Sequence, residues 1–475
     1  MGKTKTLIFS VLIVILTSCH LGPKYSQPLV ETPLQWKSSE STVPAPKVDF
    51  WWEVFNDETL NTLEKDAITN NPTLYVALER VLEARAMAGV SRANLFPQLN
   101  ANPSYQNTMF LTKLQIPALG ILPIQDQTFR IQQITNSLPF DLSYQLDLWG
   151  TYRGQYESAV YNAQAQEEAY YVSLLTLTSD LASSYFQMRA LDAQIDLLIQ
   201  TKQVRKDAYE VNQARWDGGL INYTDVTRAA LEYTNAEAQL YDSMRQRNVL
   251  ENQVAVLVGV PASNFKLEHN PLEAPPPSVP ATLPSTILLN RPDIAKAERD
   301  MASTHALIGV AYAAFFPQIS LTGTLGYLSP DLTHFLKWKS RLWAYGADAA
   351  QNIFDGGRNI SNLEASWANF YETSGTYQSQ VLTAFQEVED ALSDIELQSL
   401  QYDSLKKSID SAKLTTILST DRYNKGLVNY LDVVDSERAE LQVEKDAIDL
   451  LGQRYLSTIH LIKALGGTWN SPCTK

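Results

Sequence analysis

Residues 215–226 read RWDGGLINYTDV, and residues 422–433 read RYNKGLVNYLDV. The two stretches lie 207 residues apart, as Gly426 does from Gly219, and they share most of their residue types. Each stretch separates two long segments with helical periodicity. A duplicated connection of this kind indicates an internal repeat, which takes precedence over the several ordinary domains that a chain of 475 residues would suggest.

The shared residue types predict a tight turn between two helices. The glycine suits the left-handed conformation that ends a helix. The asparagine suits the N-cap of the next helix, and the aspartate three residues later makes a variant of the capping box. These residues are Gly219, Asn222 and Asp225 in the first copy, and Gly426, Asn429 and Asp432 in the second. Leu220 and Leu427 follow the glycines, and we regard both turns as the tips of equivalent helical hairpins.

Both arms of each hairpin are unusually long. Apolar residues spaced three and four apart predict hairpins over about 150–258 and about 356–465, with coiled-coil-like seams. A helix of more than 60 residues, such as 154–216, would be roughly 90 Å long. Two antiparallel helices of that length cannot form the core of a compact domain.

Strand-like segments precede each hairpin. The pattern predicts strands at about 99–109, 136–149, 318–327 and 342–354, with loops around Gly120 and Pro330. Apolar and polar residues alternate along 138–148, which suits a half-buried sheet or a water-filled membrane barrel. Four strands are too few to close a barrel, so strands that span a membrane would have to be shared among chains: eight in a dimer, twelve in a trimer.

The N-terminus resembles the signal peptide of a secreted protein. Lys3 and Lys5 precede a short apolar segment that ends in Leu16-Thr17-Ser18-Cys19, which is similar to the lipobox of bacterial lipoproteins. The expected organisation is a signal peptide at 1–18, a lipidated arm at 19–55, a first repeat at 56–269 (strands about 97–149), a proline-rich linker at 270–286, a second repeat at 287–467 (strands about 317–355) and a tail at 468–475.

Composition excludes several classes of function. The formal net charge of -14 argues against a nucleic-acid partner. The five histidines show no metal-ligand spacing, and two cysteines give no disulfide framework. No phosphate-binding glycine loop, zinc motif or nucleophile elbow occurs, so we expect no enzyme, no metal and no cofactor besides the lipid on Cys19.

Several motifs together resemble the TolC-like outer-membrane efflux factors, in particular the lipoprotein branch serving resistance-nodulation-division pumps. They are the lipobox, the Phe50-Trp51-Trp52 cluster, Asn71-Pro72, Phe96-Pro97, the stretch Leu289-Asn290-Arg291-Pro292-Asp293-Ile294 and the doubled Gly-Leu tip. The resemblance implies a mostly helical homotrimer, in which a 12-stranded barrel in the outer membrane continues into a periplasmic α-helical barrel. It also implies a periplasmic adaptor and an inner-membrane transporter as partners, small molecules or drugs as cargo, and a role in antibiotic resistance.

The resemblance also implies a gate at the tips. Asp432 and Asp435 match two aspartates that form acidic rings at the periplasmic entrance. Tyr423 matches a tyrosine that links neighbouring hairpins in the closed state, and Asp225 matches its acidic partner. The repeat equivalent of Asp435 is Arg228, so the two tips are not interchangeable.

Three other functions stay open at this point. The same architecture could serve as an exit duct for a secreted polypeptide, although the lipobox and the linker favour the pump branch. A lipid-anchored periplasmic scaffold of coiled coils would need no channel. Catalysis is the least favoured reading. A copper or silver role has no support, because methionines are few and none cluster near the start of the mature chain.

Overall fold

The computed structural model describes residues 21–28, 31–33, 35–37, 50–116, 125–279 and 290–467. The predicted signal peptide, Cys19, the loop around Gly120, the end of the linker and the tail after residue 467 lie outside these ranges. The chain divides into two compact units, and each unit takes segments from both sequence repeats. One unit includes 83–163 and 300–373 and contains the sheet; the other includes 164–299 and 374–467 and contains the hairpins.

The chain begins with short elements that lead into the first strands. A 3₁₀ turn η1 (Trp51–Phe55) precedes α2 (Glu58–Asn70) and α3 (Pro72–Ala93). Asp57 caps α2 by accepting from the Leu60 amide at 3.0 Å, and Pro72 occupies the first turn of α3, where a missing amide hydrogen costs nothing. The remaining short helices are η2 (Ala262–Asn264), α7 (Pro292–Ala313), η3 (Leu332–His334) and η4 (Trp338–Ser340).

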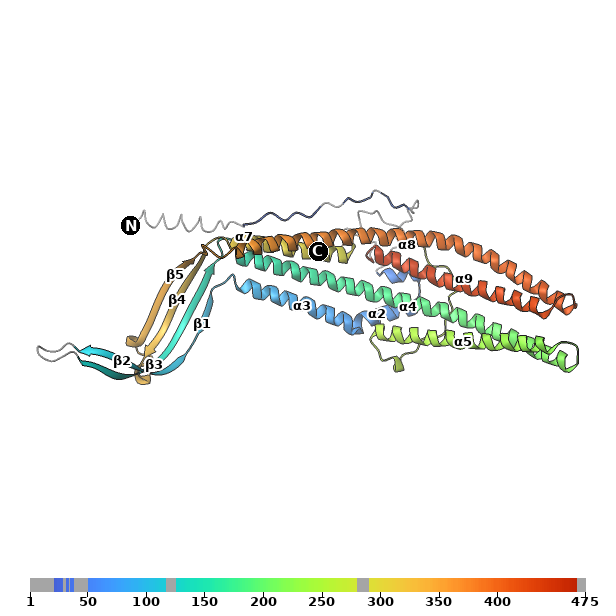
Figure 1. Ribbon diagram of the computed structural model, residues 1–475, viewed down its shortest axis with the longest axis horizontal. Helices are drawn as coiled ribbons and strands as arrows, with labels where there is room; N and C mark the ends of the chain where they lie inside the picture. The colour runs from blue at the N-terminus through green and yellow to red at the C-terminus, as the bar shows by residue number, and fades with distance from the viewer. Residues whose placement is uncertain are drawn as a thin grey trace. The chain divides into compact units, whose positions relative to one another are not determined.

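The sheet is antiparallel and has the order β1-β3-β4-β5 (Figure 1). Its strands are β1 (Gln98–Ala101), β2 (Ser104–Ile116), β3 (Gln125–Leu146), β4 (Gln318–Ser329) and β5 (Arg341–Ala350). Because β1 and β2 pair with successive parts of β3, they act as one edge strand interrupted at residues 102 and 103. Residues 136–146 of β3 pair with β4, so strands from both repeats share one sheet.

The predicted strand limits were wrong in two places. The first predicted pair, 99–109 and 136–149, is in fact much longer, since β2 and β3 stay paired from Ser104↔Ser137 to Ile116↔Gln125. Residues 110–116 and 125–135 contain no glycine or proline, so nothing interrupts the extended backbone where a loop was expected. At the other end, the strands stop at 146 and 350 rather than 149 and 354, because β4 begins at Gln318 and the pairing ends at Leu146↔Ile319 and Gln318↔Ala350.

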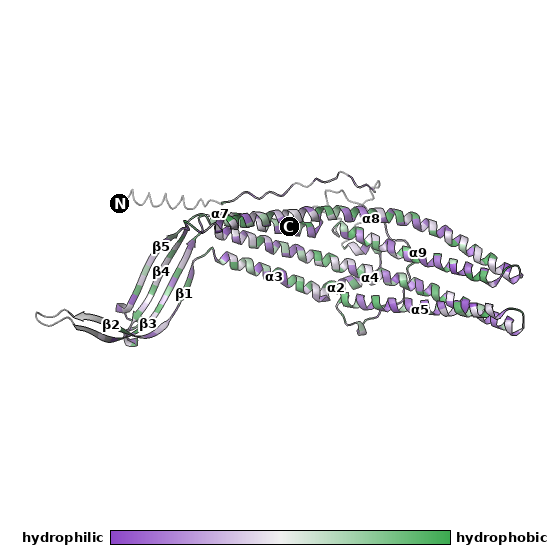
Figure 2. Ribbon diagram, in the orientation of Figure 1, coloured by the Kyte–Doolittle hydropathy of each residue, from purple (hydrophilic) through white to green (hydrophobic). Residues whose placement is uncertain are grey.

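Two helical hairpins make up most of the second unit (Figure 1). The first joins α4 (Thr151–Asp217) to α5 (Tyr223–Val258), and the second joins α8 (Arg358–Asn424) to α9 (Tyr430–Ala464). Hydrophilic and hydrophobic residues intermingle along all four helices (Figure 2). No helix among the described residues is both long and apolar enough to cross a bilayer.

The core of this unit lies where the two hairpins meet the aromatic cluster. Trp51 and Trp52 are buried, and the Trp51 indole donates to Thr178 Oγ1 at 3.2 Å. Phe186 of α4 lies between Phe55 and Tyr455 of α9, at centroid distances of 4.8 and 4.4 Å. The aromatic residues near the N-terminus therefore join helices from the two repeats.

The repeat is also visible in two close backbone crossings. Gly259 and Gly466 follow α5 and α9 with φ of +84° and +87°. A Cβ on Gly259 would lie 2.5 Å from the carbonyl oxygen of Asn70, and one on Gly466 would lie 2.6 Å from that of Asn290. Asn71 and Arg291, the next residues, then bond back to the same helix ends. Only glycine permits either crossing.

Candidate functional site

The two hairpin tips have the same backbone geometry. Gly219 and Gly426 have φ of +73° and +72°, in the left-handed region predicted from the repeat. The Leu220 amide donates to the Arg215 carbonyl at 2.8 Å, and the Leu427 amide donates to that of Arg422 at 2.9 Å. These bonds satisfy carbonyls at the ends of α4 and α8. They leave the two leucine side chains 77% and 67% exposed.

The caps that follow the tips differ in detail. The Asn222 side chain accepts from the Thr224 amide at 3.2 Å and so caps α5. At the start of α9, Asp432 completes the other half of the capping box by accepting from the Asn429 amide at 3.1 Å. Asp432 therefore stabilises the start of α9 by bonding to the backbone.

Of the acidic residues singled out for a gate, Asp432 and Asp435 lie on the surface of one tip, and Asp225 is partly buried at the other. Asp432 and Asp435 are both exposed near the start of α9, and Asp435 lies 3.7 Å from the Arg438 guanidinium. At the other tip, Asp225 lies 3.8 Å from the Arg228 guanidinium. Each tip thus has an i,i+3 acid–base pair, but the pair is shifted by one helical turn between the copies.

Tyr423 connects the two hairpins of the chain. Its hydroxyl donates to Asn212 Oδ1 on α4 at 3.1 Å, so its partner within the chain is Asn212 rather than Asp225. The ring packs 5.4 Å from that of Tyr430, and the Arg215 guanidinium lies 5.5 Å from its centroid. The link between Tyr423 and Asp225 of neighbouring hairpins stays a prediction.

A buried ionic cluster next to the tips was not predicted. Arg205 of α4 and Glu232 of α5 have side chains only 4% exposed, and their charged groups lie 3.1 Å apart. Arg438 of α9 reaches the same carboxylate at 2.5 Å and is half exposed. Arg205 also donates to the Glu232 carbonyl at 3.2 Å. This Arg205–Glu232–Arg438 cluster joins both hairpins through one carboxylate.

Heptad spacing was the signal that could have identified Arg205. It lies seven residues after Leu198 and seven before Asn212, and all three are buried on one seam of α4. A charged residue on such a seam indicates a partner on the facing helix. The sequence gives no clue that this partner is Glu232, or that Arg438 joins it from 206 residues away.

Burial affects the titration of two neighbouring groups. It raises the pKa of the Glu437 carboxyl, although the positive charge of Arg205 opposes the shift. Burial likewise raises the pKa of the Tyr430 phenol. The interface between the hairpins is therefore poorly hydrated close to the cluster, which strengthens the interactions of its charges.

The Arg-Pro-Asp stretch forms a second ionic centre, around the buried Arg291, with Asp293 partly exposed and Glu387 half exposed. Arg291 holds Asp293 with two parallel bonds, of 3.0 and 2.6 Å, and Nη1 reaches Glu387 of α8 at 2.6 Å. Nη1 also donates to the Ala464 carbonyl at 3.0 Å, at the end of α9. Arg291 thus holds the start of α7, the middle of α8 and the end of α9 together.

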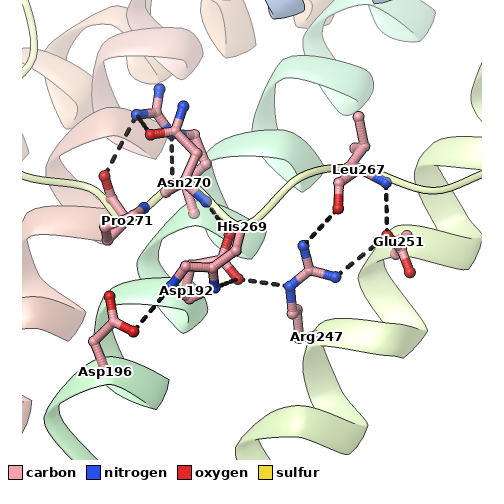
Figure 3. A network of polar contacts seen from close by, with 9 residues as sticks. Asp192, Asp196, Arg247, Glu251, Leu267, His269, Asn270 and Pro271 are labelled. Atoms are coloured by element: carbon pink, nitrogen blue, oxygen red, sulfur yellow. Dashed lines mark hydrogen bonds and ion pairs between the residues drawn. The ribbon is translucent and has the colours of Figure 1, made fainter.

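The start of the linker is fixed by a polar network around Asp192 (Figure 3). This fully buried carboxylate accepts from Arg247 at 2.6 Å and from the Asn270 amide at 3.0 Å. The His269 ring lies between two carboxylates, 3.1 Å from Asp192 and 2.9 Å from Asp196. Its pKa is raised, mainly by the hydrogen bond to Asp196, with the charge of Asp192 adding to the effect.

We expect the linker to be held less firmly as pH rises. Because the folded-state pKa of His269 is raised, its stabilising contribution is complete below the unfolded value of about 6.5 and is lost as pH passes the folded value. Hydrogen exchange of the backbone around 265–272 should be slower at about pH 5 than at about pH 9, relative to the intrinsic rates.

The variant His269→Gln should remove this pH dependence, whereas His460→Gln, which changes an exposed histidine of α9, should keep it. Equal pH dependence in the His269→Gln and unaltered chains would contradict the role given to His269.

Comparison with known proteins identifies the class. The model of the family described as outer membrane efflux protein matches residues 63–260 and 283–467. The chain belongs to this family, and like the family it is a protein of the bacterial outer membrane. It is 30% identical to the cation efflux system protein CusC of Escherichia coli, over 99% of this chain and 100% of that protein.

Other proteins that the chain resembles have different names. The solvent efflux pump outer membrane protein SrpC of Pseudomonas putida is 29% identical over 96% of this chain and 97% of its own length. The open state of the MtrE outer membrane channel of Neisseria gonorrhoeae superposes with a TM-score of 0.81, at 28% identity, covering 94% of this chain and 98% of that one. The predicted TolC-like family and a mostly helical fold with a sheet are thereby confirmed, and the trimeric 12-stranded barrel stays a prediction.

Proposed function

We propose that this chain is the outer-membrane exit duct of a tripartite efflux system and conducts small molecules passively, without catalysis. The duct is a homotrimer, docked through a periplasmic adaptor to an inner-membrane transporter of the resistance-nodulation-division type. The relatives' names mention cations in one case and solvents in another, so the proposal concerns the duct rather than a particular cargo.

The unpaired edges of the sheet are the main support for this proposal. Among the described residues, β1 and β2 pair only with β3, and β5 pairs only with β4, so both edges of the sheet lack a partner in the chain. Open edges are not tolerated in the hydrocarbon region of a membrane. Pairing of β5 of one copy with β1 and β2 of the next closes the sheet, and three copies with four strands each give a 12-stranded barrel.

The hairpins supply the periplasmic part. Their tips expose Leu220 and Leu427 on rigid turns, which suits apolar docking onto an adaptor. In a trimer, three copies of Asp432 and Asp435 form acidic rings at the entrance, and the links from Tyr423 hold the hairpins closed until a pump docks. Lipid on Cys19 adds an anchor in the membrane, which mass spectrometry of the mature N-terminus would detect as a diacylglyceryl cysteine.

Conductance tests the duct and its gate together. Purified trimers that resist dissociation in detergent should form cation-selective channels in planar bilayers. We expect hexaamminecobalt to block them from the periplasmic side. The double variant Asp432→Ala with Asp435→Ala should weaken that block at least tenfold, because the rings lose six charges that act close together in each trimer.

The control for this test is Asp410→Ala, which removes an exposed carboxylate of α8 before its tip. It should leave the block unchanged. Trimers without conductance would favour the scaffold instead, and dependence of a polypeptide's export on this chain would favour the secretion duct. If the block were unchanged in the double variant, both aspartates would only stabilise the start of their helix and would not form rings in the pore.

A further inference from the structure

The turn between β4 and β5 combines exposed apolar side chains with positive charges. Within residues 330–340, Leu332, Leu336 and Trp338 are 73%, 69% and 74% exposed. Lys337 and Lys339 alternate with them, and Arg341 follows at the start of β5. Large apolar side chains exposed together in this way indicate a binding surface.

The backbone of this turn is well fixed. Asn136, a buried residue of β3, donates through its side chain to the carbonyls of Ser329 and Pro330, at 3.1 Å each. Two 3₁₀ turns follow, and the Ser340 hydroxyl closes the segment by donating to the His334 carbonyl at 2.8 Å. The apolar side chains are thus presented to the surroundings by an ordered scaffold.

The charges of the turn are unusual for this chain. The segment contains three positive residues, Lys337, Lys339 and Arg341, and only one acidic residue, Asp331, although the chain as a whole has a net charge of -14. For neither lysine is an ion pair recorded among the described residues. The Arg341 guanidinium lies 3.7 Å from the centroid of the Trp338 ring, which keeps a cation and an aromatic ring at one site.

The apolar surface continues onto the sheet. Arg341, Trp343 and Tyr345 alternate along β5 and therefore lie on one face. Trp343 and Tyr345 are exposed, and their rings stack with centroids 5.9 Å apart. A cation followed by aromatic rings along a strand is the arrangement found at the boundary between lipid headgroups and acyl chains.

The position of the turn agrees with such a boundary. It lies at the ends of β4 and β5 that are remote from α7 and α8. The two strands have 12 and 10 residues, close to the roughly 9–11 that a transmembrane strand needs. If the sheet spans the outer membrane, as the proposed function requires, the turn lies at the headgroups of the outer leaflet.

We propose that the β4–β5 turn is a lipid-docking element. Leu332, Leu336 and Trp338 insert at the top of the acyl region, and Lys337, Lys339 and Arg341 bind phosphate groups of the outer-leaflet lipids. Lipid is the expected partner because the turn combines apolar side chains with surplus positive charge, and an anionic headgroup layer complements both. This inference depends on the proposed function, because it needs a spanning sheet.

Site-specific fluorescence tests the docking. The full chain with Cys473→Ser and Leu336→Cys is labelled with an environment-sensitive dye and reconstituted in phosphatidylcholine vesicles containing phosphatidic acid. The chain without Leu336→Cys corrects for any label at Cys19. We expect quenching by nitroxide lipids and protection from aqueous iodide. When brominated phosphatidic acid competes with phosphatidylcholine, quenching of the label should show a preference for the anionic phosphatidic acid.

Removing charge should reduce that preference. The variant Lys337→Gln with Lys339→Gln should lower it by about fivefold for each lysine. The control Lys206→Gln with Lys425→Gln removes the same charge from the helical hairpins and should have no effect. Planar-bilayer conductance, measured on the same preparations, reports separately on the proposed function.

Two results would overturn the inference while the duct stands: conducting trimers whose label is quenched by iodide but not by nitroxide lipid, or whose label is quenched by neither. The second result would assign the turn to a contact between copies of the chain. Preparations that bind lipid but do not conduct would instead contradict the proposed duct, and preparations that neither conduct nor bind lipid would contradict both.

Discussion

The variant Glu232→Gln should lower the free energy of local opening at the hairpin tips by about 3 kcal/mol or more. The physical reason is that removing one partner of a buried ion pair leaves an uncompensated charge. Arg205 is 4% exposed, its Nε already lacks a hydrogen-bond partner among the described residues, and Glu232 supplies the carboxylate that balances it. A glutamine keeps the shape of the side chain but not its charge.

Hydrogen exchange measures this opening segment by segment. A single unfolding free energy is not suitable, because a chain with two compact units does not unfold in one step. We expect faster exchange at α4 around residue 205 and at the start of α9, where Arg438 loses its bonds to Glu232 and keeps only its pair with Asp435. In cells, the loosened tips should admit vancomycin, which a closed duct excludes.

The chain contains a matched control on the same helix. Glu237 of α5 pairs with Lys202 of α4 at 2.8 Å, but both side chains are about one-third exposed. An ion pair in contact with water contributes only about 0–1 kcal/mol, so Glu237→Gln should change exchange little. If Glu232→Gln and Glu237→Gln changed hydrogen exchange equally, the cluster would contribute no more than a surface ion pair. The predicted entry of vancomycin would then have no physical reason.

Local features of the fold could be predicted because their causes are local. The left-handed glycines at 219 and 426 and the Asn222 cap follow from a few adjacent residues, and the structure has them. Strand existence followed from alternation, but strand length did not. Residues 125–135 carry too many polar side chains for a half-buried strand, yet pairing with β2 extends through them.

The ionic centres could not be predicted because their partners are distant in sequence. Glu232 and Arg438 are 206 residues apart, and Arg291 and Glu387 are 96 apart. Sequence periodicity places each residue on a helix face but does not give the register between two helices. Asp192 and Glu232 are buried and central to the networks, although both are acidic residues of long surface helices.

The variant Arg291→Ala should lower the free energy of local opening in the helical unit by about 1.5–3 kcal/mol, because it removes several hydrogen bonds of a buried charged group at once. Without the guanidinium, the carboxylates of Asp293 and Glu387 lose their shared cation, and the Ala464 carbonyl loses a buried donor. Arg291→Lys should recover only part of this, because an ammonium cannot make the two parallel bonds to Asp293.

Hydrogen exchange at the end of α9 and the start of α7 gives the readout for this centre. We expect both segments to open together in Arg291→Ala, since Arg291 is the residue that joins them. Arg299→Ala, which removes a half-exposed arginine of α7 paired with its neighbour Glu298, should stay within about 1 kcal/mol of the unaltered chain. Loosening confined to α7 would mean that the close crossing of Gly466 and Asn290, rather than Arg291, holds the end of α9 in place.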